Sequence, residues 1–109
     1  MDEAIATTIP WTVFLDVTVN PSWLTLARGV RDAILAEHLA PLLERHAPVT
    51  RMEWFDADAY SATPTDIGVI TTTDLDDWAT LLTAIKDSPL IAHGHYTIDR
   101  VLVTRSSTR

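Results

Sequence analysis

Hydrophobic residues follow two different periods along this chain, and the order of those periods limits the fold more than any other feature. Segments in which apolar and polar residues alternate predict strands, and segments in which apolar residues recur every three or four positions predict helices. The two kinds occur in the order strand, helix, strand, strand, helix, strand. Strands are expected over residues 11–19, 48–55, 66–72 and 95–103, and helices over 26–46 and from a cap at 73–74 to residue 87.

The first strand has two unlike faces, and this difference predicts how the layers are arranged. One face is entirely apolar and the other is mixed: the first holds Val13, Leu15, Val17 and Val19, and the second holds Thr12, Phe14, Asp16 and Thr18. Right-handed crossovers place both helices on one face of the sheet, so the other face is left bare. We therefore expect an α+β, ferredoxin-like β-α-β-β-α-β sandwich with strand order 4-1-3-2. A twin sheet from a second subunit would cover the bare face and give a homodimeric α/β barrel with twofold symmetry.

Helix-capping and helix-breaking residues predict where the helices begin, bend and end. Pro41 removes one hydrogen bond inside the first helix, so a kink or break is expected there. Charged residues, Arg31 among them, are expected on the side of this helix that faces away from the apolar stripe. Thr73 or Asp74 is expected to cap the second helix, and the Asp87-Ser88-Pro89 sequence is expected to end it.

Composition limits the class of protein. The 109 residues fit one domain, with residues 1–9 as a flexible arm, 10–104 as the ferredoxin-like domain and 105–109 as a frayed tail. Only eight Lys and Arg stand against a net charge of -7, which argues against non-specific binding to nucleic acid or to an anionic membrane. The chain has no cysteine for disulfides or thiolate ligands. With no secretory signal and no long apolar stretch, a cytoplasmic protein is expected.

Several short segments, in matching order and spacing, resemble the darcynin family. The central one is similar to that family's motif of an aromatic pair, Asp-Ala, an acidic residue, Ala-aromatic, a small residue and Ala. The segments are Trp54-Phe55-Asp56-Ala57-Asp58-Ala59-Tyr60-Ser61-Ala62, Pro21-Ser22-Trp23-Leu24, Leu39-Ala40-Pro41-Leu42-Leu43 and Asp87-Ser88-Pro89, followed by Tyr96. The similarity covers roughly residues 11–103. It implies a ferredoxin-like, dimeric α/β-barrel fold, and it implies no firmly assigned common activity.

The sequence departs from the family pattern around its last two histidines. His93-Gly94-His95 stands where the family usually has apolar or Pro residues. Such a departure fits a specialised role, for example a tailoring step in bacterial secondary metabolism. Dimeric α/β-barrel proteins recur there as cofactor-free monooxygenases, cyclases and isomerases, which is an analogy at the level of the fold.

The histidines are the first candidates for chemistry near neutral pH. His93 and His95, two positions apart, would share one strand face, where they could bind a metal, act as acid or base, or form a solvated loop pair. Gly94 between them favours a turn and the solvated pair. His38 lies near the edge of the apolar stripe, either as a general base in an apolar pocket or as a boundary residue. His46, at a helix end, is interpreted as structural.

Asp16 is the most informative carboxylate. It shares a strand face with Phe14, where burial would raise its pKa and make it a candidate base. The alternative, which we favour, is an ion pair with Arg100 of the last strand.

Two aromatic residues are candidates for binding. Trp54 shares a face with Met52 and Asp56 and could form the wall of an apolar ligand pocket or pack in a dimer interface. Tyr60, in the long loop over 56–65, could donate a hydrogen bond to a developing oxyanion or serve only in packing.

The sequence has no Gly-rich phosphate loop, no nucleophile elbow and no His-Glu-x-x-His motif, so we expect neither an organic cofactor nor a metal. Our hypothesis is a cofactor-independent enzyme that acts on an apolar or aromatic metabolite by acid–base chemistry: cyclisation or isomerisation, with oxygenation as a variant. The alternative is a non-catalytic dimeric binding or accessory protein. The candidates for proton transfer are His38, His93, His95 and Asp16, and those for the substrate pocket are Phe14, Trp54 and Tyr60.

Overall fold

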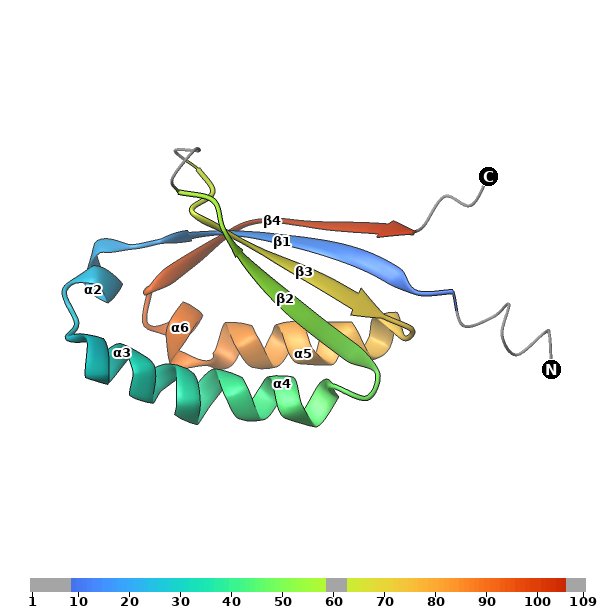
Figure 1. The fold of residues 1–109 in the computed structure, drawn as a ribbon, viewed down its shortest axis with the longest axis horizontal. Helices are drawn as coiled ribbons and strands as arrows, with labels where there is room; N and C mark the ends of the chain where they lie inside the picture. Colours follow the sequence, from blue (N-terminus) through green and yellow to red (C-terminus); the bar gives the residue numbers. More distant parts are fainter. Residues whose placement is uncertain (1–8, 59–62, 106–109) are drawn as a thin grey trace.

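A computed structural model describes residues 9–58 and 63–105 of the chain. Its four strands form one antiparallel sheet in the order β2-β3-β1-β4 (Figure 1). The strands are β1 (Trp11–Val19), β2 (Thr50–Asp56), β3 (Asp66–Thr72) and β4 (Tyr96–Arg105). This is the predicted ferredoxin-like order, with β1 in the centre beside β3 and β4. The predicted arm up to residue 8, the tail from 106 and Tyr60 lie outside the described residues.

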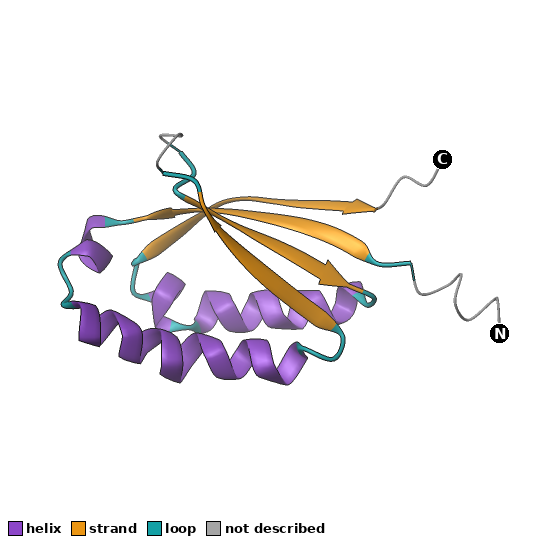
Figure 2. Ribbon diagram, viewed as in Figure 1, coloured by secondary structure: helices purple, strands orange, loops and turns teal. Residues whose placement is uncertain are grey.

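The helices cover one face of this sheet and leave the other face without a helix (Figure 2). They are α2 (Pro21–Leu24), α3 (Arg28–Ile34), the π-helix η1 (Leu35–Leu39), α4 (Ala40–His46), α5 (Leu75–Asp87) and α6 (Pro89–Ala92). The core lies between the two layers and consists of Val13, Leu15, Val17, Ile70, Trp78, Leu81 and Ile85. Burying each such side chain contributes about 1.5–3 kcal/mol before the entropy of ordering the chain is subtracted. In the part of the chain described, no helix is both long and apolar enough to cross a membrane.

The first long helix differs from the expectation of one α-helix kinked at Pro41. It begins at Arg28, and a π turn over Leu35–Leu39 separates α3 from α4. Pro41 has no N–H to donate to the carbonyl of residue 37, and its ring crowds that carbonyl. A wider π turn accommodates both problems, so the break lies one turn earlier than predicted.

The last strand is longer than expected and reaches Arg105, which the sequence had assigned to the tail. Trp11 and Arg105 are directly paired across β1 and β4. The Arg105 guanidinium lies 4.6 Å from the centre of the Trp11 ring. This cation–π contact stabilises the end of the strand, and neither local alternation nor propensity signals it.

A buried polar network fastens α4 to α5 and to the sheet. His46 Nδ1 lies 2.9 Å from Asp77 Oδ1, and the Thr50 hydroxyl donates to Asp77 Oδ2 over 2.6 Å. Thr50 also shares a 2.8 Å hydrogen bond with Thr72. The Thr50 hydroxyl and then His46 hold the pKa of the Asp77 carboxyl below its ordinary value, against the opposing effect of burial. His46 is therefore committed to structure, as its position at the helix end had indicated.

Replacing Asp77 should destabilise the fold in a pH-dependent way. We expect D77N to lower the free energy of unfolding by about 1–3 kcal/mol near neutral pH, because the Thr50 hydrogen bond to a charged acceptor is lost. Since the pKa of Asp77 is lowered on folding, its contribution is present above the ordinary value of 3.8 and is lost as pH falls through the lower, folded-state pKa. The difference between D77N and wild type should shrink over that acid range. Urea unfolding across a pH series measures it.

Asp76 offers a matched control, since it is an exposed carboxylate in the same helical turn. D76N should cost less than D77N. Equal losses in the two variants would show that the helix dipole, and not the network, accounts for the effect.

Candidate functional site

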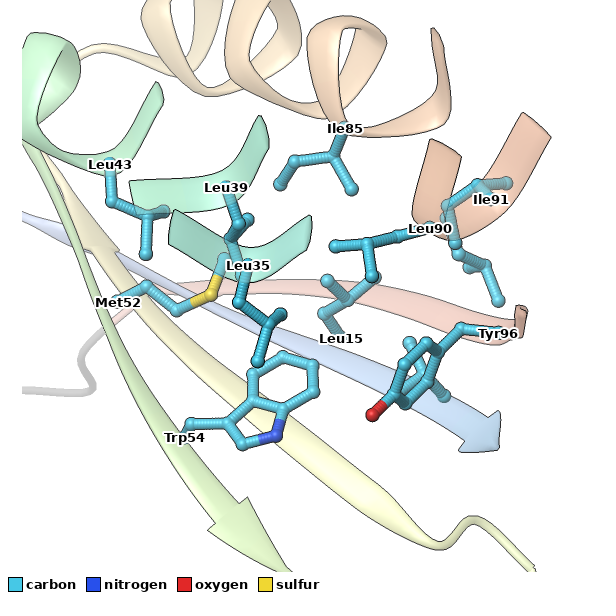
Figure 3. Close-up of a pocket in the computed structure, with 12 residues that line it drawn as sticks. Leu15, Leu35, Leu39, Leu43, Met52, Trp54, Ile85, Leu90, Ile91 and Tyr96 are labelled. Atoms are coloured by element: carbon cyan, nitrogen blue, oxygen red, sulfur yellow. The ribbon is translucent and has the colours of Figure 1, made fainter. Parts of the chain in front are cut away.

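An apolar cavity of about 200 Å³ lies between the helices and the sheet (Figure 3). The lining residues come from β1, η1, α4, β2, α5, α6 and β4, so both layers of the fold contribute. They are Leu15, Val17, Leu35, Leu39, Leu43, Met52, Trp54, Ile85, Leu90, Ile91, Tyr96 and Ile98. The π turn contributes Leu35 and Leu39 from its two ends. All but two of these side chains are aliphatic or thioether, so the cavity is a site for an apolar group.

Gly68 gives Trp54 its position in the cavity wall. The two residues are direct partners across β2 and β3. A β-carbon at position 68 would lie 2.9 Å from Cζ3 of the Trp54 indole and 3.2 Å from Cε3. The indole therefore lies over the bare backbone of β3, and Trp54 stays 47% exposed.

Of the side chains that the structure describes, two bring a nitrogen or oxygen to the cavity lining. These are the Trp54 indole N–H and the Tyr96 phenol, which Figure 3 shows at the end of the cavity away from the helices. Tyr96 is half-buried, and its ring packs against Trp23 with the ring centres 5.4 Å apart. Burial, and then the charge of Asp66, raises the pKa of Tyr96, with a smaller opposing effect of Arg31. The phenol is therefore protonated at neutral pH and presents an O–H donor at the mouth.

Asp66 and Arg31 supply the charges around Tyr96. Asp66 pairs with Val17 of β1 and so lies on the helix side of the sheet. Burial raises the pKa of Asp66, partly offset by the Thr65 hydroxyl, 3.0 Å away. Arg31 lies one helical turn before the cavity residue Leu35 and is half-buried. The site thus combines an apolar interior with a polar mouth.

This placement corrects the expectation that Arg31 lies on the solvent side of its helix. The apolar stripe in the sequence predicted that the charged residues lie on the opposite face of the helix. Arg31, however, is four residues before Leu35 and therefore lies on the same helix face as this cavity residue. A long side chain can lie along apolar surface and still hold its charge at the edge.

The predicted histidines lie away from the cavity. His38 is half-buried, with Nε2 3.7 Å from the neighbouring Glu37 carboxylate. His93 and His95 do meet, with ring centres 6.3 Å apart, in the turn between α6 and β4 where Gly94 has a φ of 74°. His95 Nδ1 lies 3.0 Å from the Ser22 hydroxyl. Across residues 9–58 and 63–105, no three His, Asp or Glu side chains are grouped closely enough to hold a metal ion.

Two other predicted residues lie on the opposite face of the sheet. Asp16 is buried, and its Oδ2 accepts a 3.1 Å hydrogen bond from Arg100 Nε, which confirms the favoured ion pair. Phe14 pairs with Val69 and Leu102 on that same face. Neither residue contacts the cavity between the layers.

Among the predicted site residues that the structure describes, which excludes Tyr60, Trp54 alone lines the cavity, and it does so with Met52 as the sequence had indicated. The sequence reasoning missed Tyr96, Asp66 and Arg31 as site residues. The i, i+4 relation of Arg31 to Leu35 was a usable signal for one of them. For Asp66 and Tyr96 the signal is the strand register, which brings them near each other across β1 and which the sequence does not contain.

A methyl group at Gly68 should disturb this wall. We expect G68A to displace the Trp54 indole and to lower the free energy of unfolding by about 1–3 kcal/mol, because the added carbon overlaps the ring. Unfolding in urea and the indole N–H resonance of Trp54, assigned with a W54F variant, measure the two effects.

Gly29 provides the control, since a β-carbon there meets no atom within 4 Å. G29A should be stabilising by about 0.5–1 kcal/mol, because alanine favours a helix over glycine. A G68A protein with an unmoved indole resonance and undiminished stability would refute the close packing of Trp54 on Gly68.

Residues 3–107 match the model of a family described as Darcynin, domain of unknown function. A relative called Darcynin 1, from Acinetobacter baumannii, is 37% identical over 65 residues, which is 60% of this chain and 71% of that protein. A Darcynin homolog from Granulibacter bethesdensis is 33% identical over 72 residues, which is 62% of this chain and 58% of that protein.

Among solved structures, a mutant chlorite dismutase from Candidatus Nitrospira defluvii matches 99% of this chain with a TM-score of 0.81 at 18% identity. A protein described as a putative chlorite dismutase matches 90% of it with a TM-score of 0.76 at 15% identity. The chain spans less than half the length of these two chains, 44% and 45%. At such low identity the likeness shows a shared fold.

Proposed function

The chain belongs to the darcynin family, and we propose that it binds an apolar or aromatic small molecule in the cavity between its helices and its sheet. The observation that carries this proposal is the lining, in which Trp54 and Tyr96 alone bring a nitrogen or oxygen. An apolar cavity of ~150 Å³ accommodates benzene. A cavity of about 200 Å³ therefore suits one substituted ring or two small fused rings.

We also propose that the bound molecule undergoes acid–base chemistry that needs no organic cofactor, such as isomerisation or cyclisation, with oxygenation as a variant. Tyr96, which lines the cavity, and Asp66, whose charge acts on Tyr96, support this choice better than the histidines and Asp16. Asp66 itself is not a lining residue, and it lies on the helix side of the sheet. Asp66 would take a proton from carbon next to a carbonyl, and the Tyr96 O–H would bond to the enolate oxygen. The alternative is a binding or accessory protein that uses the same cavity without turnover.

One experiment with 2-tetralone, a neutral two-ring ketone, tests both proposals. In H2O the Trp54 indole N–H resonance reports binding. In a parallel sample in D2O, loss of the ligand protons next to the carbonyl reports exchange. L35F should weaken binding at least tenfold by filling the cavity, whereas L24F, the same change at the exposed Leu24, should leave it unchanged. D66N and Y96F should keep binding and slow the exchange at least tenfold.

The outcomes separate the alternatives. Failure of 2-tetralone and related one- or two-ring compounds to bind below about 1 mM would overturn the binding proposal. Binding with no exchange beyond that of free ligand would favour the non-catalytic alternative. D32N, an exposed carboxylate change on α3, should affect neither measurement.

We further propose that a second copy of the chain covers the open sheet face. The register places Phe14, Phe55, Ile67, Val69 and Leu102 together on that face. Phe55 is 50% exposed and Leu102 is 42% exposed. Contiguous exposed apolar surface of this kind marks an interface. In a dimer with a twofold axis, this same patch on each of the two copies would cover the other.

A charge on this face should prevent the assembly. We expect the wild type to sediment as a dimer at micromolar concentration and L102D to sediment as a monomer. L24D places the same charge at an exposed leucine on α2, away from the sheet, and should remain dimeric. A monomeric wild type would overturn the proposal.

A further inference from the structure

We propose that the ligand carries a carboxylate, held at the mouth of the cavity by Arg31 and Tyr96, while its apolar ring occupies the interior. This inference rests on the proposed binding function and specifies the class of ligand. Both polar groups that reach the lining can donate: the Trp54 N–H only donates, and the Tyr96 hydroxyl donates and can also accept. Within residues 9–58 and 63–105, no carboxylate, amide or aliphatic hydroxyl side chain lines the cavity. A ligand that satisfies these groups must bring acceptors.

The state of Arg31 indicates that the acceptor group on the ligand is an anion. Its Nε is buried and has no hydrogen-bond partner among residues 9–58 and 63–105. Arg31 also takes part in none of the ion pairs between described residues, which join His38 to Glu37, His46 to Asp77 and Arg100 to Asp16. A buried donor without an acceptor is unfavourable, and a carboxylate presents the two oxygens that a guanidinium binds best.

The helix geometry places Arg31 at the outer end of the cavity. It stands one turn before Leu35, and because helical side chains lean toward the N-terminus of their helix, its side chain extends outward from Leu35. The row that lines the cavity, Leu43, Leu39 and Leu35, therefore continues into Arg31 at the end where Tyr96 lies. The positive charge of Arg31 lowers the pKa of the Tyr96 phenol slightly, against the larger raising effects of burial and Asp66.

Three carboxylates near the mouth of the cavity oppose the binding of an anion, so removing one of them should strengthen that binding. Asp56, Asp58 and Asp66 lie at the hairpin end of β2 and β3 and would instead attract a cation. Asp56 and Asp58 are exposed, and Asp56 accepts a 3.3 Å hydrogen bond from the Asp58 backbone N–H. Asp66 acts on Tyr96. It should therefore repel a bound carboxylate, so its removal should tighten binding of an acid and leave a neutral analogue unaffected.

Three probes of one shape test the inference: 2-naphthoate, the neutral 2-naphthamide and the cationic 2-naphthylmethylamine. Calorimetry on the full chain should show 2-naphthoate binding at least tenfold more tightly than 2-naphthamide. R31Q should reduce that preference to threefold or less without changing the affinity for 2-naphthamide. D66N should strengthen 2-naphthoate binding severalfold, and R45Q, which removes an exposed charge on α4, should do nothing.

Each outcome decides the matter. Equal binding of the acid and the amide by wild type, or an R31Q protein that keeps the preference, would overturn the inference and leave the proposed binding function intact. Preference for the amine would also overturn it, in favour of a cationic ligand at the aspartates. Failure of all three probes while 2-tetralone binds would overturn this inference alone, and failure of all four compounds would overturn the cavity proposal as well. A wild-type backbone spectrum for R31Q shows that the variant is folded.

Discussion

The structure depends on the apolar face of the central strand β1. Val13, Leu15 and Val17 alternate along it and are almost fully buried against α5 and the first long helix. Because β1 pairs with both β3 and β4, the direction of this one face fixes which side of the whole sheet receives the helices. A slip by one residue would turn these side chains toward the open face and bring Asp16 into the core.

The candidate site lies at the edge of that hydrophobic core. Trp54, held over Gly68, forms a side wall of the cavity, and the core residues Leu15, Val17 and Ile85 form part of the same lining. The cavity lies at this transition between packed core and solvent. Arg31 and Asp66, the charged groups nearest Tyr96, are each only partly buried, which limits the cost of removing their charges from water.

Sequence patterns could predict the architecture because its signals are local. The alternation in β1, the cap at Asp74 and the stop at Pro89 each depend on a few neighbouring residues, and each lies where it was expected. Asp16 and Arg100 could be paired from the strand order alone. The site could not be assembled in this way, because Tyr96 and Asp66 are thirty residues apart in sequence. Only the strand register places them opposite Val19 and Val17, on either side of β1. Histidine side chains can act as acids or bases near neutral pH, but His46 contacts Asp77 and has a structural role.

The π turn between α3 and α4 has a further consequence for how this scaffold can vary. A π turn is equivalent to one residue inserted into an α-helix, and one residue rotates everything before it by about 100° about the helix axis. The helix therefore has two independently phased halves: α4 is set by its packing on α5 and β2, whereas α3, which carries Arg31, is set by the insertion. Loss of a single residue within Leu35–Leu39 would restore a regular helix and turn Arg31 away from the cavity without changing the phase of α4. Members of this fold could in this way exchange a charged cavity mouth for a neutral one by a change in length, with no substitution at the mouth itself.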